Sequence, residues 1–147
     1  MKSRLAVMLA ALWWGSLTGL GFVVVPMLFA NLGAPAAAGA LAARLFTAQT
    51  WLSIGCTLLL LIVSHRKATP VADFVDRFDM KLIVTGLLLT VLVEFGVSPR
   101  IVTARVTGGD LRLWHGLGSA MYLGQWLCAG LALWCLSRPT APRPNDD

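Results

Sequence analysis

The sequence predicts an all-α membrane protein, a bundle of four transmembrane helices arranged as two helical hairpins. Of its 147 residues, 57% are hydrophobic and only 13% are charged, and the mean hydropathy is +0.75. A soluble domain of this size needs a polar surface that 12 basic and 7 acidic residues cannot supply. Most of the surface must therefore meet lipid, which excludes a secreted or cytosolic enzyme.

Four apolar runs are long enough to cross about 30 Å of hydrocarbon, which takes roughly 20 helical residues. We expect a single domain, residues 1–137, with spans at about residues 5–29, 44–64, 80–98 and 113–136. Backbone groups in lipid must bond internally, and residues 58–63 do not alternate as barrel strands do, so the spans are predicted to be helices. Residues 138–147 form a Pro-rich tail that we expect to be disordered.

The basic residues predict the orientation and the partner. With the N terminus inside, eight Lys and Arg residues lie on the inner side and four on the outer side, which favours cytoplasmic N and C termini. The apolar stretch after the opening Met-Lys-Ser-Arg is about twice as long as in a signal peptide, so we interpret it as a retained helix. The net charge is +5, and the basic residues flank the spans without forming a basic stripe. This pattern predicts a lipid bilayer and no nucleic acid as partner.

Glu94 interrupts the third span, about 20 Å along the helix from Lys81. A carboxylate in hydrocarbon is costly, so it should face the bundle with a partner or be protonated. One interpretation is a proton- or cation-binding site in an outer-side polar cluster, and the other is a clamp between helices three and four. The partners that we expect on the outer side are Arg100, Arg44, Arg112 and His115.

The fourth span carries polar groups on one face. Ser119 and Tyr122 follow His115 at i+4 and i+7, so they share a side of the helix. An imidazole there could relay protons or bind a metal, but a lone histidine is more often a hydrogen-bonding strut. Metal-ligand spacings such as HExxH and CxxC are absent, and the cysteines show no paired spacing. We therefore predict no metal and no cofactor, and keep a redox or metal protein as the weakest alternative.

Small residues mark the expected helix contacts. Gly15 and Gly19 form a GxxxG step in the first span, and a stripe in the fourth span contains Gly116, Ala120 and Gly124. Such residues let helix backbones approach closely in lipid. We expect them to pack inside one bundle rather than between two copies.

A faint internal repeat relates the two halves. Phe22-x-x-x-Pro26 ends the first span and Phe95-x-x-x-Pro99 ends the third, while Arg44-Leu45-Phe46 and Arg112-Leu113-Trp114 open the spans that follow. The halves would be parallel hairpins related about the membrane normal. Chance or shared interfacial chemistry explains the match about as well as duplication does.

Taken together, the motifs resemble one membrane family over roughly residues 5–136. They are Trp14-Gly15, Gly21-Phe22 and Pro26-x-Leu28-Phe29, Arg44-Leu45-Phe46, Glu94-Phe95-x-x-x-Pro99-Arg100, and Leu113-x-His115-Gly116-x-x-Ser119-x-x-Tyr122. The chain is similar to the bacterial domain of unknown function 4149, related to transmembrane protein 205. The resemblance implies a four-helix protein of the bacterial inner membrane without an established activity. It also implies that Glu94, Arg100, His115 and Tyr122 belong to one group of site residues. Val93 stands where many bacterial members carry Asn.

These observations favour a non-enzymatic protein, since no nucleotide loop, nucleophile elbow or metal motif is present. We predict a small-solute or ion binding or transport-associated protein with its polar cluster around Glu94. The alternative is a structural or accessory membrane subunit in which that cluster is a helix clamp. The sequence leaves open whether the bundle works alone, as a homo-oligomer or in a larger membrane complex.

Overall fold

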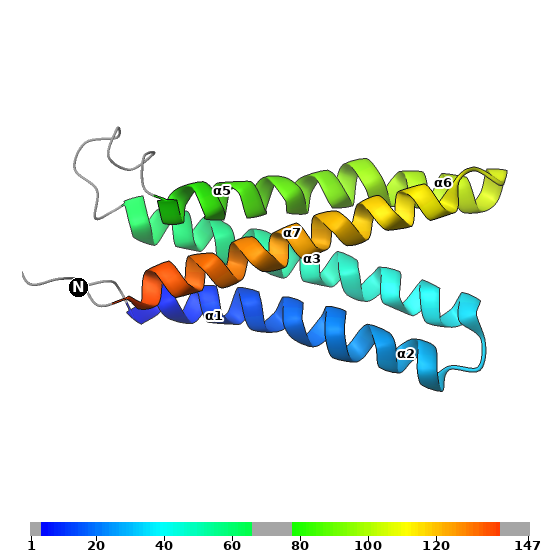
Figure 1. Ribbon diagram of the computed structural model, residues 1–147, viewed down its shortest axis with the longest axis horizontal. Helices are drawn as coiled ribbons and strands as arrows, with labels where there is room; N and C mark the ends of the chain where they lie inside the picture. Colours follow the sequence, from blue (N-terminus) through cyan, green and yellow to red (C-terminus); the bar gives the residue numbers. More distant parts are fainter. Residues whose placement is uncertain (1–3, 66–77, 139–147) are drawn as a thin grey trace, which may run out of the picture.

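A computed structural model describes residues 4–65 and 78–138, and its regular structure is helical throughout this part. The chain passes along one axis four times, and it reverses direction between one pass and the next (Figure 1). In chain order the elements are α1 (Arg4–Thr18), η1 (Gly19–Val24), α2 (Val25–Asn31), α3 (Pro35–His65), α5 (Phe78–Val91), η2 (Leu92–Val97), α6 (Ser98–Thr107) and α7 (Leu111–Ser137).

The continuous helical stretches are long and apolar enough to cross a membrane. They are Arg4–Asn31, Pro35–Ser64, Phe78–Thr107 and Leu111–Ser137. The predicted bundle of four membrane helices is therefore confirmed, and the chain is a multi-pass membrane protein. The observed helices are longer than the predicted spans, most of all at the start of the second helix and at the end of the third helix. Of the predicted tail, residues 139–147 lie outside the described residues.

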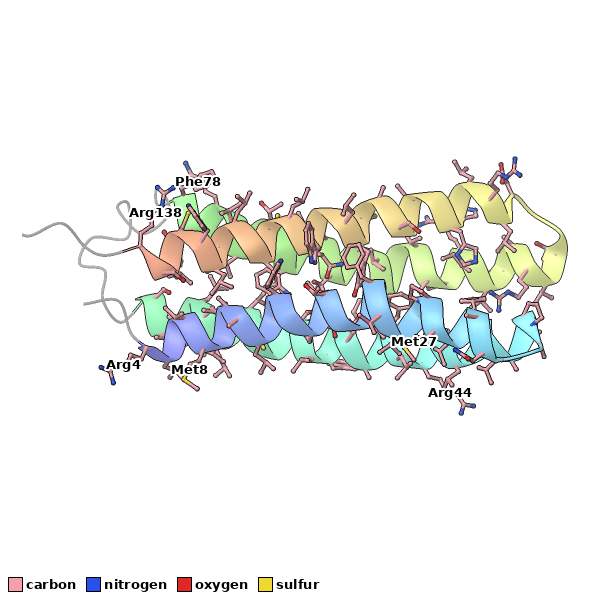
Figure 2. All side chains as sticks on the ribbon, turned by 60° about the horizontal axis from the view of Figure 1, so that its bottom comes forward. Arg4, Met8, Met27, Arg44, Phe78 and Arg138 are labelled. Atoms are coloured by element: carbon pink, nitrogen blue, oxygen red, sulfur yellow. The ribbon has the colours of Figure 1, made fainter. Side chains whose placement is uncertain are left out.

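Two short connections define one end of the bundle, which we call the connector end. Residues 32–34 join α2 to α3 and residues 108–110 join α6 to α7, and both lie at the same end (Figure 1). Gly108 ends α6 with φ 74°, a left-handed conformation that favours glycine. The side chain of Asp110 then caps α7 by accepting the backbone N–H of Leu113 at 2.9 Å. The opposite end, the terminal end, holds Arg4 and Arg138 (Figure 2).

The core lies in the half of the bundle nearer the terminal end. There α1 packs against α3 and α7, and α5 packs against the same two helices. Trp13, Leu17, Leu60 and Ile83 are fully buried between them. Towards the connector end, α2 packs against α3 and α6 packs against α7, so each hairpin stays together while the two hairpins separate.

A wide π-helical turn interrupts the outgoing helix of each hairpin at about its middle. The N–H of Val25 reaches Leu20 O, and the N–H of Ser98 reaches Val93 O, each five residues back. Proline follows as the second residue of the next helix, Pro26 in α2 and Pro99 in α6. Because proline has no N–H, the regular series of helical backbone hydrogen bonds is interrupted at this residue, and the wider π turn accommodates the interruption. The repeated Phe-x-x-x-Pro pattern thus marks the same local structure in both hairpins.

Candidate functional site

A cavity of about 620 Å³ lies where the two hairpins separate. All four membrane helices contribute to its wall, which brings together four of the predicted site residues: Glu94, His115, Ser119 and Tyr122. Its other polar lining residues include Thr47, Gln49, Thr50, Arg105 and Gln125. Arg44 and Arg100, also predicted for this cluster, are not part of the wall.

The carboxylate of Glu94 is held by two threonines of the other hairpin. Thr47 Oγ1 donates to Oε1 at 3.1 Å and Thr50 Oγ1 donates to Oε2 at 3.2 Å. The two threonines are three positions apart, so their hydroxyls lie on the same face of α3. Glu94 itself lies in η2, so these bonds link the second hairpin to the first. Within the described part of the chain, Glu94 has no ion pair.

Arg100 and Arg44, two of the expected partners of Glu94, make no contact with its carboxylate in the structure. Arg100 Nη1 donates to Gly96 O at 2.8 Å, and its guanidinium lies 5.1 Å from the ring centre of Trp114. Arg44 is exposed and points away from the bundle (Figure 2). A guanidinium on the outer surface keeps its hydration, which the interior near Glu94 does not offer.

Tyr122 contacts the other interrupted helix. Its hydroxyl donates to Leu17 O at 2.8 Å. In a regular helix residue 21 would itself bond Leu17 O, so the π turn leaves room for an inserted hydroxyl. A Cβ on Gly21 would lie 2.6 Å from Tyr122 Cε1, so glycine is what admits the ring. The ring of Phe46 meets that of Tyr122 edge-on, with centres 5.3 Å apart.

The two contacts occupy matching places in the hairpins. Gly21 and Glu94 are each the third residue of a π segment and stand 73 positions apart, as Phe22 and Phe95 do. Each π segment is met by hydroxyls from the returning helix of the other hairpin. Tyr122 of α7 reaches the first segment, and the threonines of α3 reach the second. Both helix interruptions therefore face the boundary between hairpins.

Two buried glutamines extend the polar layer towards the core. Gln49 Nε2 donates to Ser16 Oγ at 2.9 Å and to Ser53 Oγ at 3.2 Å. Gln125 Oε1 accepts the hydroxyl of Thr90 at 2.9 Å. The sequence analysis missed these residues and both threonines that hold Glu94. A usable signal was present, because polar side chains recur every three or four positions along α3: Thr47, Thr50, Ser53 and Thr57.

His115 and Ser119 lie at the rim of the cavity, where both are exposed. The three cysteines form no disulfide within the described residues, and Cys56 is buried. In residues 4–65 and 78–138, no group of three or more His, Cys, Asp or Glu side chains is arranged to hold a metal ion.

The predicted small-residue contacts are corrected by the structure. A Cβ on Gly15, Gly19 or Gly116 would meet nothing described within 4 Å, and Ala120 is exposed. Of the predicted set, Gly124 does pack, because its Cβ would lie 3.1 Å from Leu89 Cδ1. The glycines that make room for large side chains within the bundle are Gly21 against Tyr122, Gly86 against Trp13 and Gly130 against Trp14.

Comparison with known proteins identifies the family. No curated protein and no solved structure is detectably similar to the chain. Residues 8–110 match the family described as Domain of unknown function (DUF4149). The match includes Glu94 and both π segments and ends before α7, so His115 and Tyr122 lie outside it. Since the match covers most of the chain, this protein belongs to the DUF4149 family.

Proposed function

We propose that this protein binds a small solute or ion in the cavity between its hairpins, as a transport-associated membrane protein, with Glu94 as the group that holds it. The observation that carries the proposal is the environment of the Glu94 carboxylate. It lines the cavity and accepts hydrogen bonds from two uncharged hydroxyls. An ionised carboxylate inside a membrane needs a cation or a proton, and the described residues supply no cation at hydrogen-bonding distance.

The position of the cavity supports an association with transport. Glu94, Thr50 and Tyr122 each lie near the middle of a membrane-spanning helix. Many transporters bind their substrates near the middle of the bilayer, between structural repeats whose helices are interrupted. Both interrupted helices of this protein reach the cavity, through Gly21 and Glu94. We propose binding without chemical conversion.

We also propose that both termini are cytoplasmic, which places the connector end on the outer side of a bacterial inner membrane. In the sequence, more basic residues lie before the first span, between the second and third spans and after the fourth than in the other two connections, and this excess supports the orientation.

Native mass spectrometry of protein released gently from its own membranes tests the proposal. Wild-type chain should retain a small molecule or ion, and Glu94→Gln should lose it while keeping its helicity by circular dichroism. Asp110→Asn makes the same chemical change at the start of α7, outside the cavity, and should behave as wild type. Bare wild-type protein, or equal retention by Glu94→Gln, would overturn the proposal. The same spectrum gives the number of subunits.

A second candidate is a structural membrane subunit in which Glu94 is a clamp. The bonds from Thr47 and Thr50 to Glu94 join the two hairpins, which is what a clamp requires. Under this alternative, Glu94→Gln lowers the melting temperature in detergent, and neither wild type nor variant retains a small species. A retained species that depends on Glu94 distinguishes the first function from the second.

A further inference from the structure

We infer that the occupant of the cavity is an amphipathic organic cation that enters sideways from the bilayer. This inference rests on the proposed function and names the chemical class of its solute. Three properties of the cavity carry it: its charge and aromatic lining, its size and apolar wall, and the places where it opens.

The deep part of the cavity combines a carboxylate with aromatic rings. Glu94 supplies the negative charge, and Phe46 and Tyr122 line the same space with their rings at 82° to each other. The faces of aromatic rings attract cations, most strongly where water is excluded. Gln49 and Gln125 belong to the same wall. These groups suit an ammonium or a similarly diffuse organic cation.

The rest of the wall is apolar, and the volume suits a molecule rather than a bare ion. Its apolar lining residues include Phe22, Val25, Phe29, Val93, Ile101 and Leu123. About 620 Å³ falls within the roughly 300–1,000 Å³ of sites for drug-sized ligands. A metal ion would fill a small fraction of this space and would meet a single carboxylate there. The occupant therefore needs an apolar body as well as a positive charge.

The cavity opens towards lipid near the middle of the helices. Phe22 of η1 and Leu123 of α7 line it and are 53% and 47% exposed. In a membrane-spanning bundle, exposed side chains at this depth meet hydrocarbon. At the connector end the wall includes Arg105, and a Cβ on Gly39 of α3 would lie 3.8 Å from Arg105 Nη2. This guanidinium opposes a cation arriving from that end, which leaves a lipid route between the hairpins on the connector side of the contact between Tyr122 and Gly21.

The same chemistry can come from two sources. A free amphipathic cation has a charged group on an apolar body, and so has a phospholipid with an amine headgroup. Both would place the positive group at Glu94 and the apolar part towards Phe22 and Leu123.

Equilibrium dialysis of the purified full chain in dodecyl maltoside tests the inference. The probes are tetraphenylphosphonium, an organic cation, and tetraphenylborate, an anion of the same shape. We expect saturable binding of the cation only, weakened about tenfold or more, the equivalent of about 1.4 kcal/mol, in Glu94→Gln and unchanged in Asp110→Asn. Equal binding of both probes, or cation binding that is unchanged in Glu94→Gln, would overturn the inference.

A second variant keeps the test decisive if Glu94→Gln does not fold. Phe46→Leu preserves bulk but removes a ring face, so it should weaken binding of the cation several-fold and lower the melting temperature only by the loss of its edge-on contact with Tyr122. Equal affinity in Phe46→Leu and wild type would contradict the aromatic part of the inference. If neither probe binds while native mass spectrometry still finds a species that depends on Glu94, the cation class fails and the proposed function stands.

Added lipids identify the source. Phosphatidylethanolamine that displaces the phosphonium probe, where phosphatidylglycerol does not, would show that an amine headgroup occupies the site. Binding that neither lipid displaces would show a free amphipathic cation. Both results support the inference, and displacement by phosphatidylglycerol alone would overturn it.

Discussion

Tyr122 and Gly21 touch across the boundary between the hairpins, with the tyrosine hydroxyl placed beside a break in the hydrogen-bond ladder of the first helix. The hydroxyl donates to Leu17 O at 2.8 Å, and the ring occupies the space where any Cβ on residue 21 would stand. The contact ties the returning helix of one hairpin to the outgoing helix of the other. It also forms part of the cavity wall.

Gly21→Ala should destabilise the bundle. Its Cβ would lie 2.6 Å from Tyr122 Cε1, so the ring must move and the bond to Leu17 O is lost. Overpacking of this kind costs about 1–3 kcal/mol, which thermal melting in detergent would detect. Gly15→Ala is the matched control, because nothing described lies within 4 Å of its Cβ and alanine is the better helix former. Equal melting temperatures for the two variants would contradict the tight contact at Gly21.

A double-mutant cycle should show which groups hold Glu94. We expect Glu94→Gln and Thr50→Val to be coupled by about 0.6 kcal/mol, typical of hydrogen bonds between membrane helices. Glu94→Gln and Arg100→Gln should add within about 0.5 kcal/mol, because Arg100 bonds Gly96 O and lies over Trp114. Unfolding free energies in mixed micelles give both cycles. Coupling to Arg100 without coupling to Thr50 would show that the clamp is ionic after all.

Pro99→Ala should stabilise the third helix and weaken binding. The new N–H can close the ladder that proline interrupts, a gain of up to about 3 kcal/mol, and regular winding would turn Glu94 away from Thr47 and Thr50. We expect a higher melting temperature together with reduced uptake of tetraphenylphosphonium in dialysis. Pro35→Ala is the control for stability, because the first residue of α3 needs no N–H in the ladder. A lower melting temperature with unchanged uptake would show that Pro99 does not maintain the π turn.

Arg105→Gln should strengthen binding of the phosphonium probe. Arg105 follows Glu94 by 11 positions, about 16 Å along the helix, where two unit charges interact by roughly 1 kcal/mol at an effective dielectric constant of 20. Removing its charge should tighten binding about two- to fivefold at low ionic strength, and less in high salt. Arg112→Gln, outside the cavity wall, should change little. Dialysis at two salt concentrations measures both variants. Weaker binding of the probe by Arg105→Gln than by wild type would contradict the repulsion between Arg105 and the bound cation.

The fold could be predicted from the sequence because bilayer thickness and backbone hydrogen bonding together allow few structures for long apolar runs. Glu94, His115, Ser119 and Tyr122 could also be placed in one region, since helix periodicity and hairpin topology bring them to one side. The exposed surroundings of Arg44 could not be predicted in this way. Its side chain points away from the bundle (Figure 2), and helix rotation depends on packing that a single sequence does not specify.

Charge alone points to arginine as the partner of Glu94, whereas the geometry of the bundle selects two threonines. Thr47 and Thr50 carry no charge, yet their spacing on α3 matches the two oxygens of one carboxylate. The predicted contacts at Gly15 and Gly19 were wrong for a related reason. A small residue is needed only where a large one points at it, and nothing in the GxxxG spacing of Gly15 and Gly19 shows where Tyr122 or Trp13 will point.

The length of the helices has a consequence for the choice of membrane. The span Pro35–Ser64 has 30 residues and is about 45 Å long, roughly 15 Å more than the hydrocarbon layer. α6 is less apolar than α1, α3, α5 and α7. The excess helix length is therefore expected to project from the hydrocarbon at the connector end, with Arg105 among the headgroups and Glu94 in hydrocarbon. Bilayer thickness then sets how much of the cavity is wet: a thicker membrane draws Arg105 towards the acyl chains, and a thinner one brings water closer to the carboxylate.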